Sequence, residues 1–179
     1  MRFACFFRNL NFGRPGKPTQ AQFVRAFEQA GADDVRSFLT HGNAIFTAPS
    51  QRAALSIARR ANATLKECCG LDEPAFVRSM KHLARLVEAD PFADSPTDAI
   101  HERCVSFVTP DAVASLDLPV VTPRRDVEIF AAGPQEYFSV SRTIGASPGS
   151  PNALIERRLG IPATTRNWNT VVRIVALDR

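Results

Sequence analysis

The densest group of hydrogen-bonding side chains lies near the C-terminus, where the stretch 164–171 (TTRNWNTV) packs one arginine and two asparagines into four residues. Apolar residues recur there with the i, i+3, i+4, i+7 spacing of a helix with one buried face: Trp168, Val171, Val172 and Val175. That spacing assigns Trp168 and Val171 to the core and leaves Arg166, Asn167 and Asn169 free to bind a ligand. The alternative is structural: Arg166 caps carbonyl groups or pairs with a carboxylate, and Asn167 caps the helix.

The loop 9–17 (NLNFGRPGK) is a second candidate for anion binding, because it leads into a helix whose start is marked by the capping box Thr19–Gln22. Backbone N–H groups, the helix dipole, Arg14 and Lys17 would suit a phosphate or a carboxylate. The spacings of a P-loop and of a GxGxxG dinucleotide loop are both absent from the sequence. No cofactor is therefore predicted, and the alternative is a solvated glycine loop.

No group of residues has the spacing of a catalytic or metal site. The three histidines have no recognisable nucleophile motif around them, and the paired carboxylates at 33–34 and 72–73 fit a strand entrance and a turn. The four cysteines include no CxxC pair, and the adjacent Cys68 and Cys69 are poorly placed to chelate one metal or to pair with each other. We therefore predict no metal site, and the sequence leaves open whether the protein is an enzyme.

The elements that would position these residues begin with a strand at 2–8. Both faces of that strand are apolar, so we expect it to be covered on both sides. In the rest of the first ninety residues we expect a helix from Thr19 to Gly31 and strands at 35–40 and 44–48. A helix from Ser50 to Gly70, a strand at 74–78 and a helix at 80–88 are expected to follow. The resulting order is β-α-β-β-α-β with an appended helix.

The same order restarts after a proline-containing segment at 91–101, which we interpret as a linker. The predicted elements are a strand at 102–108, a short helix at 111–116, a loop at 118–126, strands at 127–132 and 136–141, a helix from Ser150 to Gly160, and a short strand at 161–165 before the final helix. The most economical fold is α+β, with two ferredoxin-like (βαββαβ) halves and appended helices. The predicted domains are 1–90, the linker 91–101, and 102–179.

The composition is that of an ordinary globular protein, with 179 residues of which 45% are hydrophobic and 22% charged. The net charge of +4 comes almost entirely from arginines that never run longer than a pair, which is compatible with an anionic partner or simply with an arginine-rich composition. The apolar run before Arg8 is too short for a signal peptide or a membrane span. We therefore predict a cytoplasmic protein with no membrane contact.

A ferredoxin-like sheet leaves one face without helices, and that face must be covered or must bind something. We favour packing of the two halves against each other. The alternative is a platform for single-stranded nucleic acid, on which Phe6 and Phe46 would stack bases.

Several segments follow the pattern of a known family, nearly end to end and in order: 8–13 (RNLNFG), 35–46 (VRSFLTHGNAIF), 152–157 (NALIER), 159–160 (LG) and 164–171. They resemble the bacterial domain-of-unknown-function family DUF1697. The resemblance implies a soluble protein with two ferredoxin-like halves and no established activity. The chain departs from the usual family pattern at Asn9, where glycine is common, and at His41, where serine is common. The segment 145–150 (GASPGS) lacks the usual lysine, which predicts weaker or altered binding if that lysine meets an anion in relatives.

Polar residues at loops and strand ends lead us to predict a binding module for a small anionic or nucleotide-like ligand. The predicted site gathers Arg8, Asn11, Lys17, Asn43, Arg166 and Asn167. Three alternatives stay open: a binder of single-stranded nucleic acid, an enzyme with Arg8, Asn11 and His41 as the first residues to test, and a purely structural or interaction protein. The sequence does not predict the oligomeric state.

Overall fold

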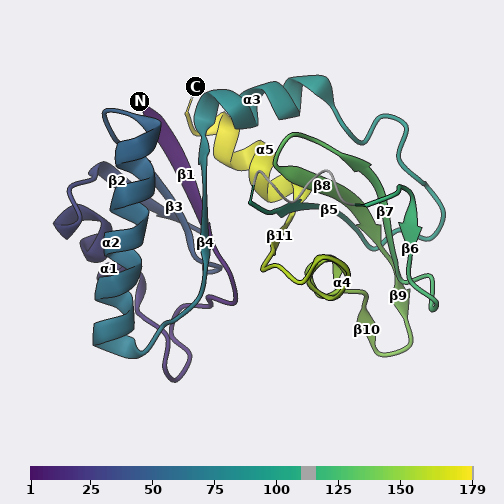
Figure 1. Ribbon diagram of the computed structural model, residues 1–179, viewed down its shortest axis with the longest axis horizontal. Helices are drawn as coiled ribbons and strands as arrows, with labels where there is room; N and C mark the ends of the chain where they lie inside the picture. The colour runs from purple at the N-terminus through teal and green to yellow at the C-terminus, as the bar shows by residue number, and fades with distance from the viewer. Residues whose placement is uncertain (110–115, 179) are drawn as a thin grey trace. The chain divides into compact units, whose positions relative to one another are not determined.

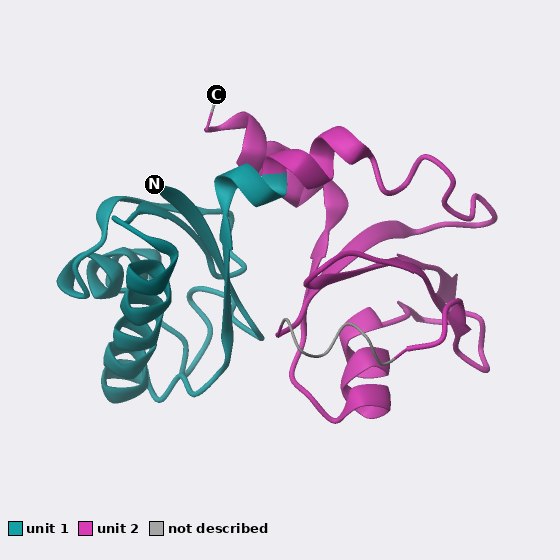
Figure 2. Cartoon of the chain, turned by 45° about the horizontal axis from the view of Figure 1, so that its top comes forward, with its two compact units in different colours: residues 1–83 teal, residues 84–179 magenta. Residues whose placement is uncertain are grey.

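The chain divides into two units, residues 1–83 and 84–179, in the computed structural model, which describes residues 1–109 and 116–178 (Figure 2). The division falls inside a helix at Met80–Ala89 (α3), before the segment 91–101 that the sequence suggests as a linker. The assignment of 1–90, 91–101 and 102–179 as half, linker and half stays a prediction. Among the described residues, no helix is long and apolar enough to cross a membrane.

Unit 1 is an antiparallel four-stranded sheet with two helices on one face (Figure 1). Its strands lie in the order β2-β3-β1-β4, so the first strand of the chain is central and β4 is an edge. The predicted order β-α-β-β-α-β is the order observed. The elements are β1 (Arg2–Phe7), α1 (Gln20–Gln29), β2 (Asp33–Phe38), β3 (Asn43–Thr47), α2 (Gln51–Cys69) and β4 (Ala75–Ser79).

Phenylalanine side chains fill the space between the sheet of unit 1 and its helices. Phe7 of β1 meets Phe23 of α1 edge to face, with ring centroids 5.3 Å apart, and Phe27 lies 5.2 Å from Phe46 of β3. Strand alternation and the four-residue helical spacing bring these rings to one side. Such ring pairs add about 0.5–1.5 kcal/mol each beyond the burial of their area.

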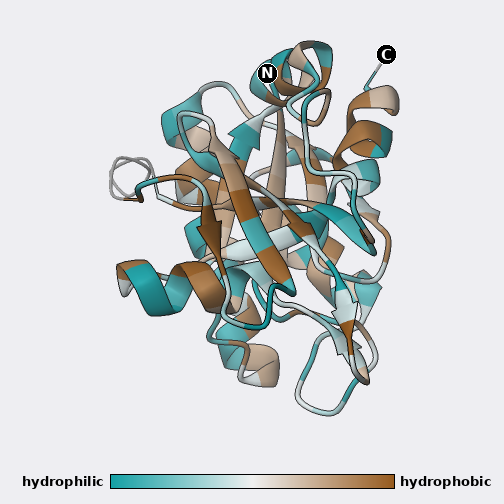
Figure 3. Cartoon of the chain, turned by 90° about the vertical axis from the view of Figure 1, so that its right-hand side faces the viewer, coloured by the Kyte–Doolittle hydropathy of each residue, from teal (hydrophilic) through white to brown (hydrophobic). Residues whose placement is uncertain are grey.

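In Figure 3 the helices change between apolar and polar colour along their length, as helices with one buried face do.

The ends of α1 and α2 follow the predicted signals. Thr19 Oγ1 accepts a hydrogen bond from the backbone N–H of Gln22 at 3.2 Å, and Gln22 Oε1 accepts one from the Thr19 N–H at 2.8 Å. Helix α2 ends where Gly70 adopts φ +70°, a left-handed conformation that glycine enters without steric cost. These caps set where α1 begins and where α2 ends.

Unit 2 contains a five-stranded antiparallel sheet in the order β11-β5-β8-β7-β6. Its first strand, β5, lies between β8 and β11, as β1 of unit 1 lies between β3 and β4. Helix α5 follows β11 without a break, as α3 follows β4. The elements are β5 (Glu102–Phe107), β6 (Val120–Val121), β7 (Val127–Ala132), β8 (Glu136–Ser141), the small hairpin β9 (Thr143–Ile144) and β10 (Ser147–Pro148), α4 (Pro151–Leu159), β11 (Thr164–Asn167) and α5 (Trp168–Ala176).

Both faces of the unit 2 sheet carry packed side chains. On the side of α4, Tyr137 and Ile129 pack with Leu154 and Ile155. An aromatic cluster contains the single tryptophan: Trp168 lies 5.2 Å from Phe92 and 6.1 Å from Phe138, measured between ring centroids. The predicted placement of Trp168 in the core is confirmed, since only 7% of it is exposed.

Two predicted elements of the second half differ from the structure or fall outside it. The short strand expected at 161–165 runs instead from Thr164 to Asn167 and pairs with β5, because its inward side chains are those that match the β5 register. The predicted loop at 118–126 contains the two-residue strand β6. The predicted helix at 111–116 lies outside the described residues, except for its last position.

The register of β1 on β3 bears on the predicted nucleic-acid platform. Phe3 stands opposite Phe46, whereas Phe6 stands opposite Asn43, three positions away along β3. Successive side chains of a strand point to opposite faces, so Phe6 and Phe46 lie on different faces of the sheet. Both rings are fully buried. These two residues therefore do not form one stacking platform.

Candidate functional site

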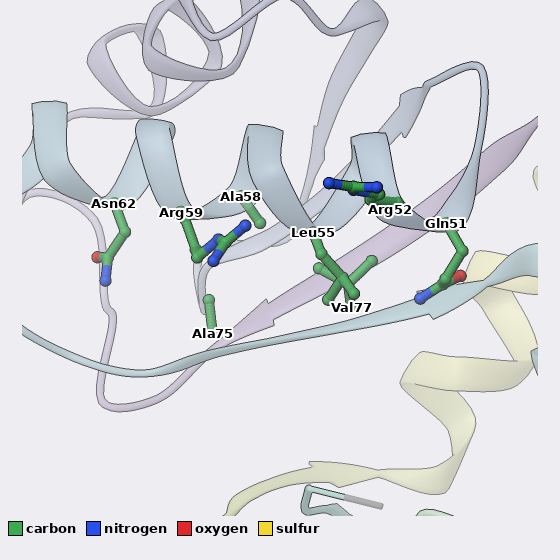
Figure 4. Close-up of a pocket in the computed structure, with 8 residues that line it drawn as sticks. All are labelled: Gln51, Arg52, Leu55, Ala58, Arg59, Asn62, Ala75 and Val77. Atoms are coloured by element: carbon green, nitrogen blue, oxygen red, sulfur yellow. The ribbon is translucent and has the colours of Figure 1, made fainter.

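A groove of about 590 Å³ lies between helix α2 and the edge strand β4, within unit 1 (Figure 4). Its helix side is formed by residues spaced three or four apart, which places them on one face of α2. Its strand side is formed by two residues two apart, which share one face of β4. The lining residues are Gln51, Arg52, Leu55, Ala58, Arg59, Asn62, Ala75 and Val77.

The floor of the groove is aliphatic. Figure 4 shows Leu55 and Val77 close to each other in the middle of the groove, with Ala58 and Ala75 farther along it. Leu55 is 45% exposed, unlike the apolar residues of α2 that face the core. An exposed leucine beside small side chains leaves apolar surface that a ligand can cover, and each Å² removed from water contributes about 25 cal/mol.

The rim of the groove is positively charged. Arg52 and Arg59 are exposed and stand seven positions apart on α2, so they share the face that carries Leu55. Figure 4 shows both guanidinium groups on that side of the helix, extending along it toward each other. Neither side chain makes a hydrogen bond or an ion pair with another residue in the described part of the chain. By contrast, Arg60 of the same helix donates to Ser56 Oγ at 3.2 Å and to the carbonyl of Ala30.

Asn62 forms one polar end of the groove. Its Nδ2 donates to the carbonyl oxygen of Glu73 at 3.1 Å, which fixes the orientation of the amide. Its Oδ1 is buried and has no hydrogen-bond partner among the described residues. A buried acceptor without a donor is unfavourable by about 1–3 kcal/mol, and a ligand donor would relieve that cost.

The described lining contains no carboxylate, imidazole or thiol. General acid–base and nucleophilic chemistry therefore have no obvious group in this groove. The arrangement is suited to binding an anion, because two positively charged guanidinium groups lie beside an aliphatic floor.

The first predicted site residue, Arg8, is held by an ion pair. Its Nη1 lies 2.8 Å from Glu73 Oε2, and Asn9 Nδ2 donates to the other oxygen of the same carboxylate at 3.2 Å. Both partners of the ion pair are largely shielded from solvent. Glu73 thus ties the end of β1 to the segment before β4, and this role accounts for Arg8 without a ligand.

The loop after β1 is fastened to the turn between β2 and β3. The N–H of Phe7 donates to the carbonyl of Gly42 at 2.9 Å, and that of Phe12 to Thr40 at 3.0 Å. Leu10 lies against Gly42 so closely that a Cβ on the glycine would stand 2.6 Å from Leu10 Cδ2. The buried Asn43 donates from Nδ2 to the carbonyl of Phe38 at 2.9 Å, across the turn.

Asn11 and Lys17 lie on this loop and are half-exposed. In the described part of the chain, neither side chain makes a hydrogen bond or an ion pair. Of the predicted residues of unit 1, these two are the ones whose side chains have no structural task in the described residues.

Arg166 and Asn167 belong to unit 2, and their hydrogen bonds are those of the structural alternative. Arg166 Nη1 donates to Thr164 Oγ1 at 2.8 Å and to the carbonyl oxygen of Thr165 at 2.9 Å. Asn167 is the N-cap of α5, and its Oδ1 accepts from the N–H of Asn169 at 2.9 Å. Four predicted site residues therefore lie in unit 1 and two in unit 2, and a single six-residue site stays a prediction.

Arg52 and Arg59 were not predicted as site residues. The sequence predicts the apolar stripe of α2 at Ala54, Ile57, Ala58, Ala61, Leu65 and Cys68; the first five are buried, whereas Cys68, in the last turn, is exposed. One signal was present in the sequence: Leu55 lies off this stripe and is flanked by arginines three positions before and four positions after it. A single exposed leucine is ordinary on a surface helix, so this signal alone does not mark a site.

The comparisons with known proteins give a family and a structure of similar fold. A family model described as "Protein of unknown function (DUF1697)" matches residues 1–138. A solved structure described as "The structure of conserved bacterial protein SP0830 from Streptococcus pneumoniae" superposes with a TM-score of 0.69 and 19% sequence identity, covering 99% of this chain and 98% of that one. A search of the curated proteins found no match.

Proposed function

Because the chain belongs to the DUF1697 family, whose description assigns no activity, we propose from its own geometry that it is a binding module for a small anionic ligand. The site is the groove between α2 and β4. The observation that carries the proposal is the pair Arg52 and Arg59, two exposed guanidinium groups on one helix face with no carboxylate partner among the described residues.

The charge pattern favours a carboxylate or a phosphate. An anion held between two guanidinium groups of one helix face gains electrostatic attraction from both. A guanidinium group presents several N–H donors in a plane, which match two oxygens of a carboxylate or phosphate. A site with a mostly apolar lining and a few directed polar groups is typical of small-molecule pockets.

The floor of the groove favours an aliphatic body for the ligand. Leu55, Ala58, Ala75 and Val77 form this floor, and no aromatic side chain is among the described lining residues. A nucleobase would gain affinity from aromatic stacking that this groove does not offer. The nucleotide-like version of the ligand is therefore less well supported than an anion with an aliphatic chain. The loop with Asn11 and Lys17 is the second candidate site for the anion, since these side chains have no described partner.

We also propose that the chain consists of two ferredoxin-like halves. The strand order β2-β3-β1-β4 of unit 1 recurs in unit 2 as β7-β8-β5-β11, with β6 added beside β7. In this fold the fourth strand is an edge and a helix lies beside it, which is the place of the groove in unit 1.

A thermal-unfolding screen tests the proposed site with octanoate, octyl phosphate and adenosine monophosphate, and with octanol as the uncharged control. A ligand present at a hundred times its Kd stabilises the folded state by about 2.7 kcal/mol. In a domain of this size that raises the midpoint by several degrees. We expect octanoate or octyl phosphate to raise it, and octanol to leave it unchanged.

Matched variants locate the site. The double variant Arg52→Ala with Arg59→Ala is expected to abolish the rise, and Arg25→Ala to keep it, because Arg25 is an exposed arginine of α1 with no described partner. Lys17→Ala tests the loop in the same assay. A rise that survives in the double variant but not in Lys17→Ala would move the site to the loop. No rise with any anion in the wild type would refute the function itself.

A further inference from the structure

Two of the four cysteines stand together at the C-terminal end of α2. Cys68 is exposed and Cys69 is half-buried, whereas Cys5 and Cys104 are buried. The groove occupies the turns of α2 from Gln51 to Asn62, so the cysteine pair is a separate feature of the helix.

Hydrogen bonds bring the two thiols to the same acceptor. Cys69 Sγ lies 2.9 Å from the carbonyl oxygen of Leu65, and Cys68 Sγ lies 3.6 Å from the same oxygen. Burial, followed by a hydrogen bond with Cys69, raises the pKa of the Cys68 thiol above its ordinary value. The two sulfur atoms therefore lie on one side of the helix and interact with each other.

Lys66, the basic residue in the last turn of α2, is already held in an ion pair with Asp72 at 2.8 Å. Glu67 acts on Cys68 electrostatically and favours its neutral form.

We propose that Cys68 and Cys69 form a dithiol site for a soft, thiophilic centre that needs only two sulfur ligands from the protein. Sulfur ligands select soft ions over hard ones. Within residues 1–109 and 116–178, no group of three or more His, Cys, Asp or Glu side chains could hold a metal ion. Structural zinc needs four ligands and does not fit. Trivalent arsenic that already carries one organic group needs only two sulfur ligands, the number that Cys68 and Cys69 supply.

Phenylarsine oxide is the probe. Each thiol gives up its proton, two As–S bonds replace the bonding of arsenic to its oxygen, and that oxygen leaves as water with no change in oxidation state. We expect intact-mass measurements to show one phenylarsenic group per chain. The adduct should protect both Cys68 and Cys69 from alkylation, survive an excess of 2-mercaptoethanol, and be removed by dithiothreitol, since only a dithiol competes with a chelating pair.

Variants that each lack one cysteine show whether both sulfur atoms bind the arsenic. Cys68→Ser and Cys69→Ser should each lose the phenylarsenic group to 2-mercaptoethanol at least tenfold faster than the wild type. Cys104→Ser should keep it, because Cys104 is buried elsewhere. Thermal unfolding of each variant confirms that it is folded. A wild-type adduct lost to the monothiol as quickly as that of Cys69→Ser would overturn the proposal, as would no adduct at all. The result is independent of anion binding in the groove.

Discussion

Arg78 and Arg166 hold equivalent positions in the two units. Each lies two residues before a helix begins and donates from Nη1 to the carbonyl oxygen of the residue that precedes it, at 2.9 Å in both cases. Both arginines are buried, and both belong to edge strands, β4 and β11. The two units therefore share this hydrogen bond as well as their strand order.

The role of Arg166 as a structural residue predicts a loss of stability when it is removed. In Arg166→Ala, Thr164 and the carbonyl of Thr165 lose a charged donor, and hydrogen bonds to charged groups contribute about 1.5–3 kcal/mol. We expect the free energy of unfolding, measured by urea denaturation, to fall by about 2–3 kcal/mol. Thr164→Val is the matched control, since it removes one acceptor and should lower stability by about 1 kcal/mol. A fully stable Arg166→Ala variant would return this residue to the candidates for ligand binding.

The contact between Gly42 and Leu10 predicts that the β2–β3 turn tolerates no side chain. Gly42 has φ +66°, and a Cβ there would stand 2.6 Å from Leu10 Cδ2. In Gly42→Ala we expect a loss of about 2–4 kcal/mol in urea denaturation, from backbone strain and from overpacking. Gly13→Ala separates the two causes, because Gly13 has φ +76° and nothing within 4 Å of the added Cβ. Equal losses in the two variants would show that the Leu10 contact contributes nothing.

Much of the fold follows from the sequence because local signals and apolar spacing agree. The capping box at Thr19, the stop at Gly70 and the apolar stripe of α2 each set one boundary or one face, and the structure has them where they are expected except at Cys68, the exposed last member of the stripe. The final strand was placed too early because the segment 161–165 and the segment 164–167 are both short and mixed in polarity. Pairing with β5, a contact between residues about sixty positions apart, decides between them.

The site was harder to infer, because a polar side chain in the sequence does not show whether it binds a ligand or the protein's own backbone. Asn43, Arg166 and Asn167 are strongly polar, and the structure shows that each satisfies backbone groups of its own turn, strand or helix. Buried backbone groups need such partners, so polar residues at strand ends are often structural. Arg52 and Arg59 gave a weaker signal in the sequence, since surface arginines are common. Only the position of β4 beside α2 turns them into the rim of a groove.

A negative charge in the floor of the groove should repel the proposed anion. Leu55 is 45% exposed and lies between Arg52 and Arg59 on α2, so Leu55→Glu adds a carboxylate that competes for both guanidinium groups. We expect a Kd for octanoate or octyl phosphate at least tenfold higher by isothermal titration calorimetry, with stability changed by less than about 0.5 kcal/mol. Leu55→Gln removes the apolar contact without adding charge and should weaken binding less. Equal weakening in both variants would mean that charge does not set the specificity.

Cys104 predicts how stability responds to alkaline pH. Burial, and after it the nearby charge of Glu102, raises the pKa of the Cys104 thiol from 9.0 to about 12. Between these two values the unfolded chain releases a proton that the folded chain retains, so the free energy of unfolding falls as the pH rises, by at most about 1.4 kcal/mol per pH unit. Below pH 9 the contribution of this group is constant. Urea denaturation at pH 8, 9 and 10 should therefore show a decline in the wild type that is smaller in Cys104→Ala. An identical decline in the two proteins would assign the alkaline destabilisation to other groups.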